Sequence, residues 1–253
     1  MSRWSRNRQL GYLLSFLLII GLIGAGWFYY HEPQITCTDG VQNGTEAGVD
    51  CGGSCSQLCR NEALPLKIIW TRVLAISPGV YAVAARVENP NLEAGVRRLK
   101  YTLRLTDANN ILVTYRSGVT FVNPAENFIL FEGGINTLNG KPTQALLQIE
   151  TPTWERVDTE GPNLIVGGKT FTNGLPARLE TTVTNRSIYD LNKVEVTALL
   201  SDAAGNALSA GQTYIEDLGR EATLTAFFAW PGRLPLAPTY IDVYPRVSIF
   251  NFK

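Results

Sequence analysis

The sequence predicts a mainly β protein: one N-terminal transmembrane helix, a small disulfide-rich segment, and two tandem antiparallel β-sandwiches. Three observations carry this prediction. An uncharged apolar run covers residues 10–30, all four cysteines lie between residues 37 and 59, and the rest of the chain alternates apolar with polar residues between turn formers. We expect a basic N-terminus at 1–9, the helix at 10–30 and a Cys-rich segment at 31–62. A first sandwich at 63–152, a linker at 153–162 and a second sandwich with an apolar tail at 163–253 follow.

The apolar run is long enough to cross a membrane. A helix rises 1.5 Å per residue, so residues 10–30 span a hydrocarbon core of about 30 Å. Positive charge stays cytoplasmic, and the charges before the run are all arginines: Arg3, Arg6 and Arg8. We therefore expect a single pass through the plasma (inner) membrane, with the N-terminus cytoplasmic and the later domains extracytoplasmic. A cleaved signal peptide is the alternative, because Gly24 and Gly26 would suit a cleavage site.

The cysteines predict disulfides in an oxidising compartment. Their number is even, and they crowd into a stretch rich in Gly, Asp and Asn. A four-thiolate zinc site is the competing interpretation, but such sites usually show two close Cys pairs separated by a longer loop. Four cysteines allow three pairings, and the sequence leaves the choice open: Cys37, Cys51, Cys55 and Cys59.

Oxygen donors in the same segment raise one cofactor candidate, calcium. Asp39, Asn43, Glu46 and Asp50 lie among glycines that let the backbone turn tightly. Calcium takes six to eight oxygen ligands from such side chains and from backbone carbonyls. The spacing differs from that of an EF-hand, and Asp and Asn are also ordinary turn residues, so solvated acids in a disulfide-closed loop are the competing interpretation.

A long internal repeat organises the remainder. Val87 and Asn89 align with Val183 and Asn185, an offset of 96 residues. Asp107 aligns with Asp202, an offset of 95. A unit of this length indicates a duplicated domain.

Both copies have the pattern of β-strands. Residues 99–106 and 194–201 alternate apolar with polar side chains, the period of a strand with one buried face. Turn formers separate such strands, as at 107–110 and 202–206. About seven short strands per copy favour a sandwich of immunoglobulin-like type. We expect the two sandwiches to stack end to end as a semi-rigid rod.

Two resemblances follow from these motifs. The strands ending in TLRLTD-ANN and ALLSD-AAGN, each preceded by a V-x-N turn, resemble the FxLYD domain and the related late embryogenesis abundant group-two domains. That resemblance implies an immunoglobulin-like sandwich in an envelope protein and no enzymatic activity; neither copy has the Tyr of the motif. The pattern C-x-D-G-x-x-N-G-x-E-x-G-x-D-C-G-G-x-C is similar to a short module of bacterial surface proteins, which implies a cell-surface location.

Several function classes find no support. Lys plus Arg and Asp plus Glu both number 22, so a basic surface for nucleic acid is not expected. The single histidine, His31, lies beside the membrane run, which leaves both sandwiches without an imidazole base. No phosphate-cradling glycine loop leads into a helix, so nucleotide binding is not expected. We predict no catalytic residues.

Aromatic residues suggest a partner surface. Neighbours along a strand alternate sides, so one of Phe227 and Phe228 must face outward, with Trp230 on the same strand. The chain also ends in an apolar tail containing Ile249, Phe250 and Phe252. The tail either packs on the second sandwich or adds a strand to a partner subunit.

The expected function is a non-enzymatic, membrane-anchored envelope protein whose tandem sandwiches serve interaction or adhesion. The alternative is an accessory or scaffold subunit of a membrane-bound complex of secretion, pilus or transporter type. Both imply a protein partner, and nothing in the sequence identifies it.

Overall fold

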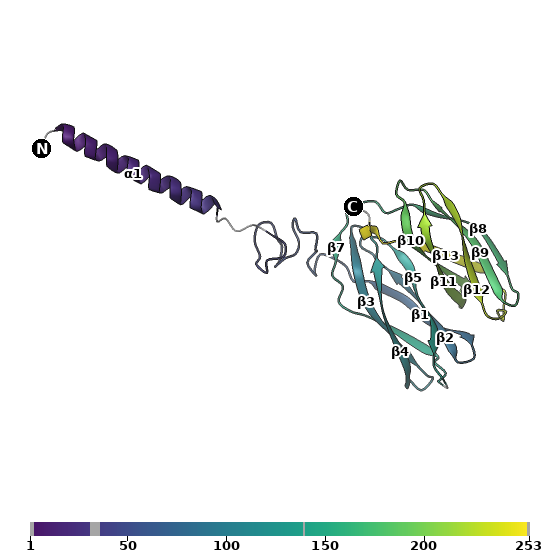
Figure 1. The fold of residues 1–253 in the computed structure, drawn as a ribbon. Helices are drawn as coiled ribbons and strands as arrows, with labels where there is room; N and C mark the ends of the chain where they lie inside the picture. The colour runs from purple at the N-terminus through teal and green to yellow at the C-terminus, as the bar shows by residue number, and fades with distance from the viewer. Residues whose placement is uncertain (1–2, 31–35, 139, 252–253) are drawn as a thin grey trace.

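A computed structural model describes residues 3–30, 36–138 and 140–251 of the chain (Figure 1). Its one α-helix, α1, covers Arg3–Tyr30. Within α1, Leu10–Tyr30 is long and apolar enough to cross a membrane, and none of its most apolar window is buried against the rest of the described chain. The chain is otherwise mainly β, as the sequence predicts.

The strands form two sandwiches with the same strand order. The first contains β1 Lys67–Ser77, β2 Val80–Glu88, β3 Ala94–Thr106, β4 Leu112–Val122, β5 Asn127–Asn136, β6 Gln144–Ile149 and the short β7 Glu155–Arg156. The second contains β8 Leu164–Thr172, β9 Ala177–Asn185, β10 Leu191–Ser201, β11 Ala207–Leu218, β12 Thr223–Trp230 and β13 Tyr240–Arg246, followed by a 3-10 turn, η1, at Ile249–Asn251.

Each sandwich packs two antiparallel sheets of three main strands, and in the first sandwich the short β7 also pairs with β3. In the first, the order β1-β2-β5 faces β4-β3-β6; in the second, β8-β9-β12 faces β11-β10-β13. Buried apolar side chains fill the space between the two sheets in each case. The correspondence is complete strand by strand: β1 to β6 match β8 to β13.

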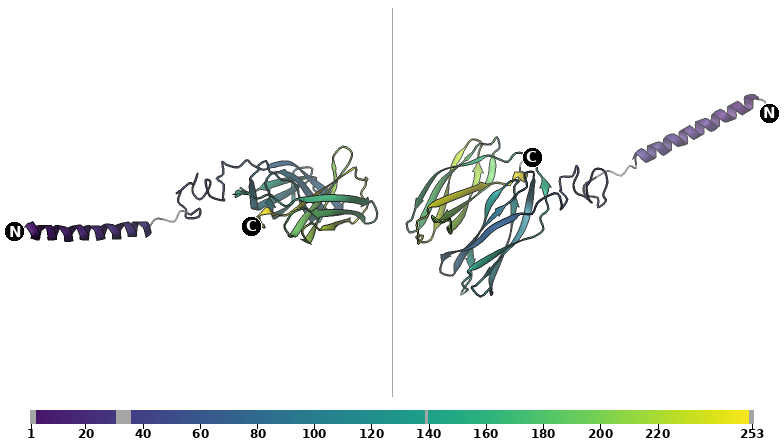
Figure 2. Two further views of the ribbon diagram at one scale, coloured as in Figure 1. Left: turned by 90° about the horizontal axis from the view of Figure 1, so that it is seen from above. Right: turned by 180° about the vertical axis from the view of Figure 1, so that it is seen from behind.

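The sandwiches stack face to face, which makes four layers of sheet (Figures 1 and 2). In order, we call the layers the first outer sheet (β4-β3-β6), the first inner sheet (β1-β2-β5), the second inner sheet (β11-β10-β13) and the second outer sheet (β8-β9-β12). A third apolar cluster lies between the two inner sheets; its buried members are Leu74, Ala82, Ala84, Ile129, Leu199 and Ala210. The expectation of an end-to-end rod was therefore wrong.

The reason lies in two strands that are buried on both faces. From Ala82 to Ala85, β2 has four consecutive buried residues, and β10 is buried without interruption from Val196 to Ser201. One face of each strand fills its own sandwich and the other has to be covered from outside. In β2 the covered outer face carries Ala82 and Ala84, so the strand reads as a continuous apolar run. In β10 this face carries Thr197, Leu199 and Ser201, so the strand alternates in polarity although both faces are buried. The side-by-side stack buries both.

Equivalent residues hold equivalent turns in the two sandwiches. The buried amides of Asn89 and Asn185 each donate from Nδ2 to loop carbonyls, and each Oδ1 accepts the backbone N–H two residues ahead. Asp107 and Asp202 each accept two backbone N–H groups of the following turn. These polar groups fix the loops at corresponding ends of the two sheets.

The first sandwich extends further along the chain than predicted. Trp154 is buried in its core, β7 pairs with the start of β3, and the Val157 N–H donates to the Glu93 carbonyl. The expected linker, 153–162, thus begins with residues of the first sandwich. Only a few residues after Val157 connect it to β8.

The layer between the inner sheets should tolerate no added volume. We expect Ala84→Leu to lower the free energy of unfolding by about 1 to 3 kcal/mol, because Ala84 is fully buried there and overpacking strains both sheets. Urea titration measures the change. Ala229→Leu, on an exposed position of β12, is the matched control and should change it by less than about 0.5 kcal/mol. Equal effects from the two variants would show that the sheets are not tightly packed.

Candidate functional site

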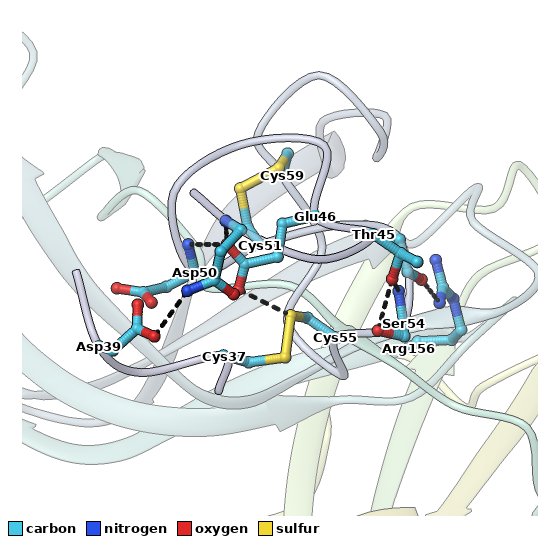
Figure 3. The surroundings of a disulfide bond; sticks show 12 residues. Cys37, Asp39, Thr45, Glu46, Asp50, Cys51, Ser54, Cys55, Cys59 and Arg156 are labelled. Carbon is cyan, nitrogen blue, oxygen red and sulfur yellow. Dashed lines mark hydrogen bonds between the residues drawn. A yellow bond between two sulfur atoms is a disulfide. The ribbon is translucent and has the colours of Figure 1, made fainter. Parts of the chain in front are cut away.

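Residues 36–62, which we call the Cys module, are held by two interlaced disulfides. Cys37 pairs with Cys55 and Cys51 with Cys59, so none of the four cysteines is free (Figure 3). The predicted disulfides are confirmed, and the pairing that the sequence left open is settled. Gly53 has a φ of +58°, and a Cβ there would lie 1.8 Å from the Thr45 carbonyl oxygen, so the turn between the bridges requires glycine.

The Cys module docks on the first sandwich through backbone hydrogen bonds to β7. The Leu58 N–H donates to the Trp154 carbonyl and the Arg156 N–H to the Ser56 carbonyl, at 2.9 and 2.7 Å. The Arg156 guanidinium donates to the Gly53 carbonyl at 2.7 Å. Leu58 of the module and the following Ala63 and Leu66 pack against the core of the sandwich. The module is therefore part of the first sandwich.

The four calcium candidates lie on one loop of the module but act mainly as turn acceptors. Asp50 accepts the Gly40 N–H, and Asp39 accepts the Val41 N–H and the Asn43 side-chain amide. The Asn43 hydrogen bond, the largest influence, lowers the pKa of Asp39 below its ordinary value and keeps it ionised. Glu46, which is buried, accepts the backbone N–H groups of Asn43 and Asp50.

Two oxygens of this loop lack a hydrogen-bond donor. Asn43 Oδ1 is buried without a partner in the described part of the chain. Glu46 Oε1 lies 3.4 Å from Cys55 Sγ, which carries no hydrogen because it is in a disulfide (Figure 3). Within the described ranges, the one group of three potential metal ligands is Cys37, Glu46 and Cys55, and two of these are oxidised. The predicted carboxylates do not converge on one point, so calcium binding stays a prediction.

A second polar site lies where the sandwiches meet. Arg246, at the end of β13, has a side chain only 3% exposed. Its Nε and Nη2 contact the two carboxylate oxygens of Glu126 at 3.0 and 3.1 Å, and its guanidinium stacks between the rings of Phe121 and Phe128 at 4.1 and 3.9 Å. Each of these partners belongs to the first sandwich. Arg246 therefore locks one sandwich onto the other.

A second carboxylate shares this arginine. Glu195 of β10 lies opposite Arg246 in the sheet, 3.6 Å from its Nη1. Burial raises the pKa of Glu195 above its ordinary value; attraction to Arg246 opposes this, and repulsion from Glu126 reinforces it. Two buried carboxylates thus compete for one cation, and Glu195 is the weaker partner.

Glu195 borders a polar cavity of about 330 Å³ between the inner sheets. Tyr101, Glu132, Gln212 and Tyr214 also line it. The Tyr101 hydroxyl donates to Glu132 at 2.5 Å, and burial raises the pKa of Tyr101 above its ordinary value. The cavity is therefore lined by hydrogen-bonding groups.

The predicted partner surface is only partly exposed. Phe227 faces outward at 62% exposure, whereas Phe228 and Trp230 are buried in the core of the second sandwich. The expectation that one of the two phenylalanines faces outward is confirmed. Burial excludes Phe228 and Trp230 from a partner surface in the folded chain.

The C-terminal tail packs on the first sandwich, not on the second. Ile249 is buried, and its N–H donates to the Asn123 side chain. Phe250 lies under the Arg97 guanidinium at 4.7 Å, and Arg97 donates to its carbonyl. Phe252 lies outside the described residues. The predicted docking strand therefore docks within its own chain.

Comparisons with known proteins add little. No protein-family model matches the chain, and no curated protein matches it. Among solved structures, it is similar to transglutaminase from red sea bream, at 13% identity and a TM-score of 0.25, over 72% of this chain and 29% of that one. The chain thus spans less than a third of the length of that protein. A likeness this distant supports no conclusion about fold or activity.

The lock at Arg246 was missed in the sequence because its parts are far apart. Glu126 and Arg246 are 120 residues apart, and each reads as an ordinary charge at a strand end. The one available signal was the run of four apolar residues in β2, Ala82–Ala85, which indicates a second face that has to be covered.

The calcium hypothesis predicts weak binding to the module, with a dissociation constant of about 0.1 to 1 mM as in other extracellular modules. We expect calcium near 1 mM to slow proteolysis within residues 38–50 relative to chelator, and Asp50→Asn to remove the difference. Identical cleavage rates in calcium and chelator would exclude the site. Glu180→Gln, on the opposite side of the stack, is the control.

Acidification from neutral pH should raise the free energy of unfolding of the stack as Glu195 becomes protonated. Because the folded-state pKa of Glu195 is raised, the folded chain holds this proton more tightly than the unfolded chain does. The resulting stability is fully present below the ordinary carboxyl pKa and is lost as the pH rises through the folded value.

We therefore expect Glu195→Gln to raise the free energy of unfolding by about 1 kcal/mol at neutral pH and to flatten its rise on acidification. Urea titrations across the acidic range measure both effects, with Glu180→Gln as the exposed control. A loss of more than about 1 kcal/mol in Glu195→Gln would show instead that the ion pair with Arg246 outweighs the cost of burial.

Proposed function

We propose that the chain is a non-enzymatic protein anchored in the plasma (inner) membrane by α1, N-terminus inside, that presents its β-stack outside the cytoplasm as an interaction or adhesion platform. One observation carries the proposal: the Cys module, both sandwiches and the tail are tied into a single block, whereas the apolar part of α1 is buried by none of it.

Three sets of contacts make this block. The Cys module is hydrogen-bonded to β7, and the inner sheets share an apolar layer. Arg246 and the tail contact the first sandwich. Such a construction suits presentation of a fixed surface. The titratable groups of the interior are used to hold layers together, which supports a role without catalysis.

The disulfides support the compartment. Two bridges in a segment too small and polar to hold a core of its own are typical of secreted and surface proteins. With the module outside, the arginines in the first turns of α1, before its apolar run, lie inside, in agreement with the positive-inside rule.

Membrane extraction tests the anchor. We expect the native chain to stay in the membrane pellet after an alkaline carbonate wash, to dissolve in detergent, and to have an intact mass that includes residues 10–30. Deletion of residues 3–30 should release a folded stack into the soluble fraction. A mature N-terminus near Trp27 would mean that the run is a cleaved signal peptide. A stoichiometric protein in the detergent complex would favour the accessory-subunit role.

A further inference from the structure

The two outer faces of the stack differ in character. On the second outer sheet, the outward residues of β9 are Arg178, Glu180, Thr182 and Thr184, a polar set with one charge of each sign. The second outer sheet also exposes Phe227, which lies opposite Glu180. On the first outer sheet, large exposed apolar residues lie opposite cations instead. This second kind of face is unusual in a region open to solvent.

The exposed face of the first outer sheet carries two rows of cationic and apolar residues, with the polar row of Thr102, Ser117 and Gln148 between them. On β3, Lys100 and Arg104 alternate with the buried Leu99, Tyr101, Leu103 and Leu105, so both cations face outward. Tyr115 and Leu146 lie directly opposite Arg104 on its two sides, and Val119 lies opposite Lys100. Tyr115, Leu146 and Val119 are 66%, 58% and 49% exposed. We call these five residues the cationic patch.

The charge of the cationic patch is poorly compensated. Lys100 has one weak ion pair, at 3.8 Å to the exposed Glu150, and Arg104 has no ion pair or hydrogen bond within the described residues. Charge complementarity therefore points to an anionic surface, and the apolar side chains to one with an accessible apolar layer beneath. A second copy stacked patch to patch would bring like charges together.

The tether places the first sandwich near such a surface. Six residues, 31–36, separate the end of α1 from Cys37, which a disulfide holds in the Cys module, and the module is bonded to the first sandwich. Even fully extended, six residues span only about 20 Å. A tether this short keeps the first sandwich at a high effective concentration near the membrane surface, so weak contacts with that surface are sufficient for binding.

From this arrangement we propose that the cationic patch docks the first outer sheet onto the phosphate headgroups of anionic phospholipids in the membrane that holds α1. Lys100 and Arg104 contact the phosphates, and Tyr115, Leu146 and Val119 enter the interfacial layer, where amphipathic and apolar side chains are favoured. The stack then lies on the bilayer with its second outer sheet directed away from it. The inference rests on the proposed anchor.

The full chain in lipid nanodiscs tests the docking. All four native cysteines are in disulfides, so one introduced cysteine takes a fluorophore specifically. Ser117→Cys places it in the exposed middle of β4 beside the cationic patch, and Ala229→Cys places it on the second outer sheet as the control. Discs contain nitroxide-labelled lipid as the quencher, with phosphatidylcholine alone or mixed about equally with phosphatidylglycerol.

We expect quenching at position 117 only in the discs with phosphatidylglycerol, and none at position 229 in either. The double variant Lys100→Gln/Arg104→Gln should lower the ratio of docked to free chains by about five-fold for each cation removed, or about thirty-fold in total. Arg178→Gln/Arg186→Gln, two exposed arginines of the second sandwich, should leave it unchanged. Raising NaCl to about 0.5 M should release the patch, because the Debye length then falls to about 4 Å.

Other outcomes overturn the docking. An unquenched position 117 in phosphatidylglycerol discs removes anionic lipid as the occupant. Equal quenching in phosphatidylcholine discs does the same. Energy transfer between 117 probes on two chains in one disc would assign the patch to a second copy. A chain that fails to remain with the disc shows that the anchor itself is wrong, which is a separate readout from quenching.

Discussion

The two strands that are buried on both faces, β2 and β10, determine the architecture of the extramembrane part. Each supplies one face to its own sandwich and one face that water would penalise. Ala82 and Ala84 on one side and Ala210 on the other are small, so the inner sheets approach closely over an apolar layer. Once these faces meet, the order of the four layers follows, and so do the positions of every loop and of both ends of the stack.

The polar lock at the rim of that layer depends on the same packing. A buried guanidinium costs several kcal/mol in desolvation unless hydrogen bonds and charges replace its water. Arg246 obtains that replacement from Glu126, from the Phe121 carbonyl and from two aromatic faces, all on the first sandwich. Apolar layers slide with little change in energy, whereas these directional contacts are satisfied in one register. The lock therefore adds specificity to the association that the apolar layer drives.

Sequence patterns predicted what local periodicity determines. The apolar run gave α1, the cysteines gave disulfides, and alternation from Leu99 to Leu105 gave a strand with one buried face. Alternation within a strand does not predict the stacking direction, because the sign of a second covered face is an uninterrupted apolar stretch such as Ala82–Ala85. The Cys pairing, the docking of the module on β7 and the contacts of Ile249 all join residues distant in sequence. No spacing rule predicts such contacts.

The equivalence of the two sandwiches raises the question of why the stack stops at two. The two inner sheets that pack together are not equivalent, because β1-β2-β5 corresponds to β8-β9-β12 and not to β11-β10-β13. The same contact repeated at either end of the stack would therefore generate an open-ended array. At the 95-residue offset that relates Asp107 to Asp202, Leu199 and Ala210 of the buried layer correspond to Arg104 and Tyr115 on the first outer sheet. At the 96-residue offset of Asn89 and Asn185, Ala82 and Ala84 correspond to Arg178 and Glu180 on the second. Large or charged side chains stand wherever the buried layer has small apolar ones. A third sheet cannot approach as closely over them, so both ends are closed to further stacking, and the surfaces left outside are free to differ from each other.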